Sequence, residues 1–558
     1  MHKSLLYALA LSGATLASVA PAAAQKTKVK VKTKTAQPAA PAQPATDWSV
    51  TYAGSITQED LRQHLSVIAS DAFEGRETGT KGQKMAADYL AKQFQELGLT
   101  GPVANSDNPY VQHFTLERSL WDTEKMKLQI GKQSYTWLTD FYSSSDSPFG
   151  QETTLQPVFV GYGIEQGDYN DYAGLDVKGK DLVALLGEPT ADGKALLGEG
   201  GKPGKWSLDS RAKTALATEK GARSIIFVNP NAAKFTENLT RFKPYLQQAR
   251  VSMPGKNLSL GKDKAEPARV SAFFVSTPLG YELLNTSEAA VAKYQAAVAA
   301  AGKPVKASFR PGKVLIRAPR KTETFATENV MGYIEGSDKK DEVLVVSAHY
   351  DHIGVIDGKI HNGADDDGSG TAAVLELAQA FAQAKAEGHA PRRSVLFLTV
   401  TGEEKGLFGS EYYTDNPIFP LAQTVADLNL DMVGRIDENH KPGDQYVSLV
   451  GSDKLSSELH AINEAANKQY TQLDFDYRYN DPNDPERVYY RSDHYNFAKH
   501  KIPVIFYTTG DHADYHKDTD DIEKIEFPLL EKRAKLVFHT AWELVNRDNR
   551  IVVDSNKP

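Results

Sequence analysis

The sequence predicts an α/β protein with a mainly parallel mixed sheet and helices on both faces. After about residue 312, continuous apolar runs that suit buried strands alternate with helical patterns. Strands that are apolar throughout and separated by helices are typical of parallel sheets covered on both sides. The chain has 558 residues, 41% of them hydrophobic, which is enough for two domains.

The elements of the main domain follow from local patterns. Two helices are expected between Ile56 and Leu99, the second from Gly82 to Leu97, where apolar residues recur at helical spacing. A polar, glycine-containing loop over residues 70–80 separates them. Further along, we expect buried strands at Val343–Ser347, Ser394–Val400, Val425–Leu430 and Ile502–Thr508, and helices at Thr371–Phe381 and Phe527–Val545.

The segment between residues 150 and 310 has a different character. Short apolar runs predict strands at 158–163, 181–186, 224–228 and 272–275, with a helix at 213–220. This composition predicts a compact α/β unit inserted into the main domain. We therefore expect a first part of the main domain over 47–149, the insertion over 150–310 and a second part over 311–558.

The N-terminus has the three parts of a secretory signal. A basic start at Lys3 is followed by an apolar run from Leu5 to Ala20 and small residues up to Ala24. We expect a signal peptide over 1–24 and a solvated linker over 25–46, rich in Lys, Ala and Pro. No other segment approaches the roughly 20 apolar residues needed to span a bilayer. The protein is expected to be exported, to the periplasm or the medium.

Charge and cysteine content exclude several functions. The formal net charge is -8, so the chain has no overall attraction for nucleic acid. There are no cysteines, which excludes a disulfide scaffold, a thiol nucleophile and a thiolate metal site. Any bound metal must be held by histidines and carboxylates.

Acidic and imidazole side chains follow each strand expected in the second part of the main domain. In an open α/β sheet, the carboxyl ends of parallel strands border the binding site. Several carboxylates gathered there would repel one another without cations. Imidazole and carboxylate ligands suit zinc, and their number suggests two ions roughly 3.5–4 Å apart. The side chains are His349, Asp351, Asp365–Asp367, Glu403, Glu404, Asp431, His512 and His516.

In this order, the segments resemble the co-catalytic zinc peptidase family of bacterial leucyl aminopeptidases, glutamate carboxypeptidases and glutaminyl cyclases. The resemblance covers Ile56 to about Leu99 and about Thr324 to Leu544. It implies a zinc aminopeptidase/phosphorylase-hydrolase-like fold and two zinc ions. It also implies that Asp366 bridges both ions, that His349 and Asp431 bind one, and that Glu404 and His516 bind the other. Asp351 would orient His349, and Glu403 would be the general base.

Two choices within these motifs rest on the resemblance. Asp366 is preferred to Asp365 and Asp367 because it lies three residues before Ser369, as in the family. His516 is preferred to His512 because it directly precedes residues 517–520, where the family's last ligand lies.

Weaker signals surround these motifs. Tyr490 or His494 could donate a hydrogen bond to a developing oxyanion, although local structural bonding explains both equally well. Residues 480–485 could bind calcium, but a proline-rich turn is the simpler interpretation. The insertion resembles a protease-associated domain through residues 158–163, 176–180 and 220–228, which implies a role in substrate access.

The resulting expectation is an exported zinc-dependent aminopeptidase that acts on peptides. A glutaminyl cyclase or a carboxypeptidase on the same scaffold remains an alternative. A catalytically inactive, receptor-like binding protein is the alternative from a different class. The sequence leaves the preferred N-terminal residue and the oligomeric state open.

Overall fold

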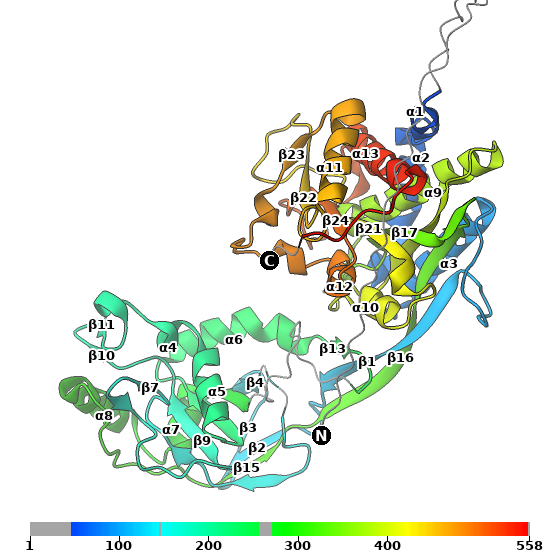
Figure 1. The fold of residues 1–558 in the computed structure, drawn as a ribbon. Helices are drawn as coiled ribbons and strands as arrows, with labels where there is room; N and C mark the ends of the chain where they lie inside the picture. The colour runs from blue at the N-terminus through cyan, green and yellow to red at the C-terminus, as the bar shows by residue number, and fades with distance from the viewer. Residues whose placement is uncertain (1–45, 144, 146, 256–269, 556–558) are drawn as a thin grey trace, which may run out of the picture. The chain divides into compact units, whose positions relative to one another are not determined.

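The computed structural model describes residues 46–143, 145, 147–255 and 270–555 (Figure 1). From Trp48 onward, the described residues belong to one compact unit. The expected signal peptide, and the expected linker up to residue 45, lie outside the described residues. In the part of the chain that is described, no helix combines the length and apolar character needed to cross a membrane.

A nine-stranded sheet forms the centre of the main domain, in the order β13-β1-β16-β20-β17-β21-β24-β22-β23 (Figure 1). Its four central strands, β20, β17, β21 and β24, run parallel, as predicted. Antiparallel pairs β1–β16, β16–β20 and β22–β24 flank them, which makes the sheet mixed as predicted, although strands β1, β16 and β22 were not themselves expected. The strands are β1 (Val111–Trp121), β13 (Arg250–Ser252), β16 (Arg320–Ile334), β17 (Lys339–His349), β20 (Arg393–Val400), β21 (Thr424–Leu430), β22 (Tyr446–Val450), β23 (Asp474–Asp476) and β24 (Val504–Thr508).

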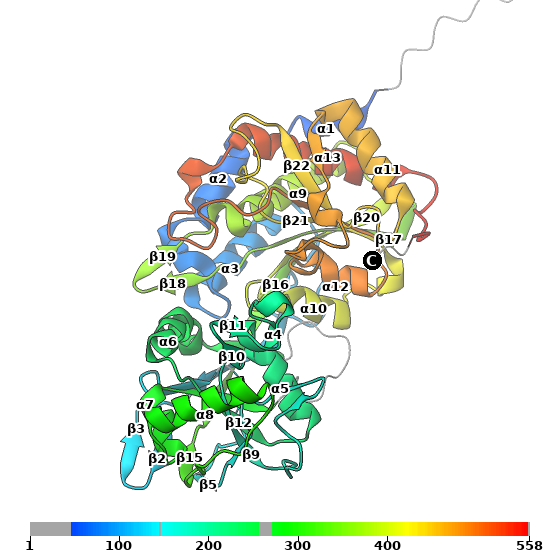
Figure 2. The same cartoon turned by 90° about the vertical axis from the view of Figure 1, so that its left-hand side faces the viewer.

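Helices cover both faces of this sheet, as the apolar strands predicted. On one face, Leu344 and Val346 of β17 pack into the largest apolar core; on the other, Val343 and Val345 join a smaller one. Figure 2 shows α9 and α13 on one side of the strands and α10 and α12 on the other. The first face carries α1 (Trp48–Ala53), α2 (Gln58–Ile68), α3 (Lys81–Glu96), α9 (Gly370–Ala386), α11 (Ser457–Ala466) and α13 (Phe527–Asn546), and the second carries α10 (Phe408–Asp415) and α12 (His494–Lys499).

Apart from β13, which joins the nine-stranded sheet, the strands between β1 and β16 build separate small sheets. The five-stranded sheet runs in the order β4-β14-β12-β9-β6, with β9, β12 and β14 parallel, and a four-stranded sheet runs β3-β2-β15-β5. These strands lie between residues 127 and 317, so they extend beyond the 150–310 segment at both ends. The strands are β2 (Lys127–Ile130), β3 (Gln133–Tyr135), β4 (Phe141–Ser143), β5 (Thr153–Leu155), β6 (Val158–Phe159), β9 (Asp181–Leu185), β12 (Ser224–Val228), β14 (Ser271–Val275) and β15 (Val314–Arg317).

The remaining elements of this region are helices and two-stranded ladders, and the main domain has one further hairpin. The helices of the region are α4 (Lys205–Leu208), α5 (Ser210–Glu219), α6 (Ala232–Gln247), α7 (Thr277–Leu283) and α8 (Glu288–Ala301). Its two-stranded ladders are β7 (Glu165–Gln166) with β8 (Tyr169–Asn170) and β10 (Thr190–Ala191) with β11 (Lys194–Ala195), and the main-domain hairpin pairs β18 (Gly354–Ile356) with β19 (Lys359–His361).

Truncating Leu344 tests the contribution of the central strand. Leu344 is fully buried, so Leu344→Ala should lower the free energy of unfolding by about 2 to 5 kcal/mol. Leu208 is 76% exposed, and Leu208→Ala should change that free energy by less than about 0.5 kcal/mol. Urea denaturation of both variants measures the difference. Equal destabilisation by the two substitutions would contradict the assigned core.

Candidate metal centre

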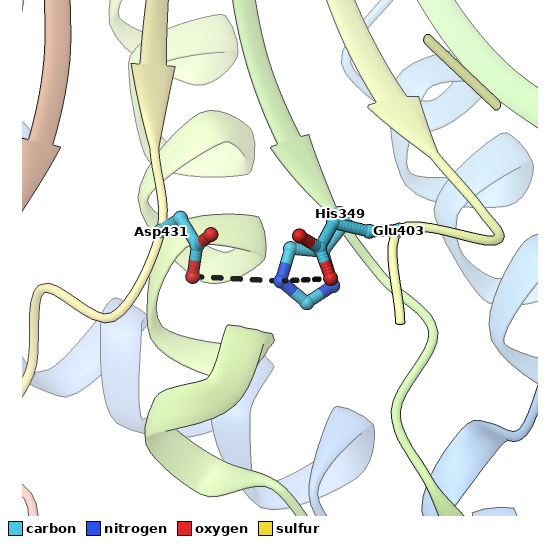
Figure 3. Close-up of side chains that lie close together, drawn as sticks. All are labelled: His349, Glu403 and Asp431. Atoms are coloured by element: carbon cyan, nitrogen blue, oxygen red, sulfur yellow. Dashed lines mark ion pairs between the residues drawn. The ribbon is translucent and has the colours of Figure 1, made fainter. Parts of the chain in front are cut away.

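The predicted ligands come together because three neighbouring parallel strands end at one edge of the sheet. β17 ends at His349, and Asp431 follows directly after β21. β20 ends at Val400, and a short turn leads from it to Glu403. Since β17 pairs with both β20 and β21 in parallel, these side chains meet beyond the same strand ends. In Figure 3, dashed lines join the His349 ring to the carboxylates of Asp431 and Glu403.

A first group of donors surrounds the Nε2 atom of His349. This atom lies 3.4 Å from Oδ1 of Asp366, 3.4 Å from Oδ1 of Asp431 and 4.0 Å from Oε2 of Glu403. The second oxygen of Asp431 accepts a hydrogen bond from the Ser492 hydroxyl at 2.7 Å. Asp431 is thereby fixed with one oxygen toward His349.

A second group of donors surrounds Glu404. The Nε2 atom of His516 lies 3.0 Å from Oε2 of Glu404 and 3.2 Å from Oδ2 of Asp366. The Nδ1 atom of His352 lies 2.8 Å from Oε1 of Glu404 and 3.7 Å from Oδ2 of Asp366. Asp366 therefore contributes one oxygen to each group, and the five predicted ligands form one connected cluster.

The three consecutive aspartates have separate roles in the structure. The carboxylate of Asp367 accepts hydrogen bonds from the backbone amides of His349, Gly370 and Met432. The Oδ1 atom of Asp365 accepts hydrogen bonds from the amide of Gly434 and the hydroxyl of Ser369. Both acids therefore hold the backbone together. Of the three, it is Asp366 that faces both His349 and His516.

The two candidate histidines near the C-terminus also differ. His512 lies 3.3 Å from Asp365 and 3.9 Å from Asp520, and its Nδ1 accepts a hydrogen bond from the amide of Asp514. These contacts place it behind the aspartate loop. His516 contacts Asp366 and Glu404, and its side chain is 36% exposed, so it lies at the open side of the cluster.

Asp351 orients its neighbours in two ways. The Nδ1 atom of His349 lies 3.1 Å from the backbone carbonyl of Asp351 and 3.8 Å from its carboxylate, which leaves Nε2 free to face the cluster. The carboxylate itself accepts hydrogen bonds from the Thr78 hydroxyl at 2.6 Å and from the Glu403 amide at 3.3 Å. Asp351 thus connects His349 to the backbone of Glu403.

A buried arginine from the N-terminal part of the domain joins the two ligand segments. Arg76 is fully buried and donates hydrogen bonds to the carbonyls of Ile68, Tyr350, Asn362 and Gly363. Tyr350 directly follows His349, and Gly363 begins the turn that carries Asp366. Burial lowers the pKa of the Arg76 guanidinium to about 10, which leaves it charged at neutral pH.

The spacing of the cluster fits metal coordination. Two ligands that each lie about 2.1 Å from a tetrahedral zinc ion are about 3.4 Å apart. The contacts of His349 with Asp366 and Asp431 have this spacing, and those of His516 with Asp366 and Glu404 come close to it.

The charge state of Asp366 and two buried atoms without hydrogen-bond partners also fit metal binding. Burial favours neutral Asp366, yet contacts with His349 and His516 hold the pKa of its carboxyl well below the usual range. In the described part of the chain, the Nε2 atom of His516 and the Oε1 atom of Glu404 are buried without a hydrogen-bond partner. Buried polar atoms without partners are rare unless an ion or water satisfies them. The donor set therefore fits two metal ions that share Asp366.

A cavity with about 440 Å³ of empty space, open to solvent, lies beside the cluster. Glu403, Asp431 and Asp366 form part of its wall, together with Arg491 and Tyr515, which sequence reasoning did not select. Burial raises the pKa of the Tyr515 phenol, so the hydroxyl stays protonated and can donate a hydrogen bond. The remaining lining residues are Met432, Tyr479, Val488, Phe506, Thr508, Gly510 and Asp511.

The two oxyanion candidates from the sequence lie elsewhere. Among the described residues, the lining of this cavity includes neither Tyr490 nor His494. His494 is fully buried and stacks on Phe506, and burial lowers its pKa to about 3. Tyr490 is 40% exposed and lines a separate cavity with Lys454 and Arg487.

The calcium alternative at residues 480–485 has a simpler explanation in the structure. One oxygen of Asp481 accepts from the amide of Asn483, and both oxygens of Asp484 accept from the amides of Glu486 and Val488. These local hydrogen bonds describe a turn, as the simpler interpretation predicted.

Sequence reasoning also missed His352, Arg76 and Thr78. His352 directly follows the His349–Asp351 motif, so its position next to a predicted strand end could have marked it as a candidate for the site. Arg76 and Thr78 lie in the loop over residues 70–80, and nothing local in that loop indicates contacts with residues about 270 positions later.

Thr78 provides a test of this arrangement. Thr78→Val removes the donor to Asp351, so the free energy of unfolding should fall by about 1 to 3 kcal/mol, because a buried carboxylate oxygen loses its partner. Thr78→Ser keeps the hydroxyl and should lie closer to the wild type. Urea denaturation of the metal-free protein measures both. Equal stability of the valine variant and the wild type would show that this hydrogen bond contributes nothing.

Comparison with known proteins agrees with the geometry. Residues 329–541 match Peptidase family M28. Aminopeptidase YwaD from Bacillus subtilis (strain 168) is 26% identical over 232 residues, which cover 40% of this chain and 46% of that protein. The probable glutamate carboxypeptidase AMP1 from Arabidopsis thaliana is 26% identical over 372 residues, covering 63% and 48%. The chain thus spans about half the length of these curated relatives.

The overall fold has a solved counterpart. An aminopeptidase from Aneurinibacillus sp. strain AM-1 aligns with 91% of this chain and 100% of its own, with a TM-score of 0.52 and 17% identity. This likeness concerns the fold alone. The segment that matches Peptidase family M28, residues 329–541, includes every ligand candidate from His349 to His516.

Proposed function

We propose that this protein is an exported zinc-dependent aminopeptidase that removes N-terminal residues from peptides. The observation that carries the proposal is the position of Asp366, whose two oxygens face His349 and His516. The family match and the aminopeptidase named among the relatives support the reaction class. Export rests on the signal-like pattern of residues 1–24.

In the proposed site, five side chains hold two zinc ions. His349 and Asp431 hold one ion, Glu404 and His516 hold the other, and Asp366 binds both. When bound, the two ions would acidify a shared water and polarise the scissile carbonyl. The two oxygens of Asp366 face different histidines, His349 and His516, which favours this arrangement over a single-zinc glutaminyl cyclase. Retention of all five ligands disfavours an inactive, receptor-like protein.

Glu403 is the proposed general base. Its carboxylate borders the cavity and lies 4.0 Å from His349 Nε2, while its backbone amide is held by Asp351. Burial raises the pKa of Glu403 well above its usual value, which brings it closer to the range in which a carboxylate can both take and return a proton. Glu403 would take a proton from the nucleophilic water and return it to the leaving amine. The Tyr515 hydroxyl is a donor available to the developing oxyanion.

A carboxypeptidase is the second candidate, because Arg491 lines the same cavity. Its guanidinium lies 3.6 Å from Asp511 and donates to the Tyr515 hydroxyl at 3.4 Å. An arginine in a substrate cavity can bind a carboxylate. Asp511 already offsets part of its charge, which favours the aminopeptidase.

The inserted segment, residues 150–310, is proposed to be a protease-associated domain that restricts access of large substrates. Its parallel core strands β9, β12 and β14 and their helices form an apolar core of their own. A separate core is what an inserted module requires, and the sequence motifs within it support the assignment.

Metal analysis together with two substrate panels tests the proposed function. Purified protein should contain close to two zinc ions per chain and should hydrolyse aminoacyl-nitroanilides with a free α-amine. Peptides with a blocked amine and a C-terminal glutamate should be poor substrates. Preference for the blocked peptides would select the carboxypeptidase, and absence of zinc together with absence of hydrolysis would refute the proposal.

Adjacent substitutions separate the base from the ligand. Glu403→Gln should keep both zinc ions and reduce kcat by about 100- to 10,000-fold, because proton transfer is lost while the ligands remain. Glu404→Gln should lose zinc as well, since it removes a charged ligand. The exposed Glu438→Gln serves as a control that changes neither quantity. Near-normal turnover by Glu403→Gln would exclude Glu403 as the base.

A further inference from the structure

His352 is a buried histidine to which the ligand assignment gives no role. Its side chain is fully buried, and it lies within the same donor group as Asp366 and Glu404. Neither of its ring nitrogens has an aligned hydrogen-bond partner among the described residues. An imidazole with this degree of burial requires a polar or charged partner to offset its desolvation.

The position of the ring is set by two segments. The backbone amide of His352 donates to the carbonyl of Arg76 at 3.3 Å, and the residue pairs with Glu77 in a short parallel bridge. The ring itself lies against Gly363, where an added Cβ would come within 2.5 Å of the imidazole Cγ. Gly363 also has φ +57°, which favours glycine. The backbone and the missing side chain together create the space that the imidazole occupies.

The distances separate His352 from the ligands. Ligands of one tetrahedral zinc ion lie at similar distances from one another, about 3.4 Å, and His516 lies at similar distances, 3.2 Å from Asp366 and 3.0 Å from Glu404. The Nδ1 atom of His352 lies 2.8 Å from Oε1 of Glu404 and 3.7 Å from Asp366. His516 contacts the other oxygen of Glu404 at 3.0 Å. The two oxygens of Glu404 are therefore divided between two imidazoles.

We propose that His352 is a positioning residue that pairs with Oε1 of Glu404 and thereby keeps Oε2 directed to the ion beside His516. The proposal rests on the proposed metal site. The Nδ1 and Oε1 atoms are in direct contact at 2.8 Å, without the alignment of a hydrogen bond. A glutamate side chain has three torsions. A partner that holds one carboxylate oxygen restricts these torsions beforehand, so metal binding costs less conformational entropy.

Two substitutions at position 352 test this role. His352→Leu removes the polar partner, and His352→Asn keeps an N–H donor near the place of Nδ1 but is a poor zinc ligand. Zinc is added to the metal-free proteins in competition with a chelator, and X-ray absorption counts the imidazoles bound per zinc. His352→Leu should weaken the second zinc by about 10- to 100-fold and leave the first unchanged. His352→Asn should recover most of that affinity, and the imidazole count should stay at the wild-type value in both variants.

The exposed His500→Asn is the matched control and should bind both ions as the wild type does. Thermal unfolding of the metal-free variants checks that each one folds. If the leucine variant does not fold, the asparagine variant still tests the proposal, because loss of the second zinc ion from His352→Asn would contradict a positioning role for His352. Unchanged affinity in His352→Leu, or a lower imidazole count in either variant, would also overturn it, the latter because His352 would then be a ligand. A wild-type chain that binds no zinc would refute the proposed function itself.

Discussion

The repulsion among buried carboxylates at one edge of the sheet is the constraint on which the rest of the site depends. Ligand atoms of Glu403 and Asp431 lie within 4.8 Å of each other, as do those of Asp366 and Glu404, and little of each side chain is exposed to water. Such a group is stable only if positive charge is supplied. Imidazoles supply part of it, and the spacing of the remaining donors leaves room for metal ions.

Hydrogen bonds to the backbone, as well as side-chain contacts, hold this group in place. Asp520 accepts hydrogen bonds from the amides of Asp365 and Asp366, and Arg76 binds the carbonyls that flank the same turn. Asp367 joins the turn to the end of β17 through the amide of His349. Acids that do not face the metal cluster thus fix the one that does. These contacts among protein groups fix the conformation of the turn that carries Asp366.

Adjacent glutamates show how one turn can serve two purposes. Glu404 is directed to the histidines of the second group, whereas Glu403 borders the cavity where a substrate would lie. Their backbone is held by Asp351, which also contacts His349. The proposed ligand and the proposed proton acceptor are therefore adjacent in the chain but face different groups. The cavity combines apolar residues with Arg491 and Asp511, so it offers both packing and charge recognition to a substrate.

The sequence alone determined the parallel centre of the sheet and the set of ligand candidates. Both follow from local patterns: apolar runs such as Val343–Ser347, and acids or histidines at the residues after them. Only the tertiary structure decided how these side chains divide. Of the three aspartates, it directs Asp366 to the histidines and uses Asp365 and Asp367 to bind the backbone. It places Tyr515, rather than Tyr490 or His494, in the wall of the cavity. It also places His352, Arg76 and Thr78 in contact with the ligand segments. The reason is that side-chain direction and contacts between distant segments depend on packing, which no local pattern records.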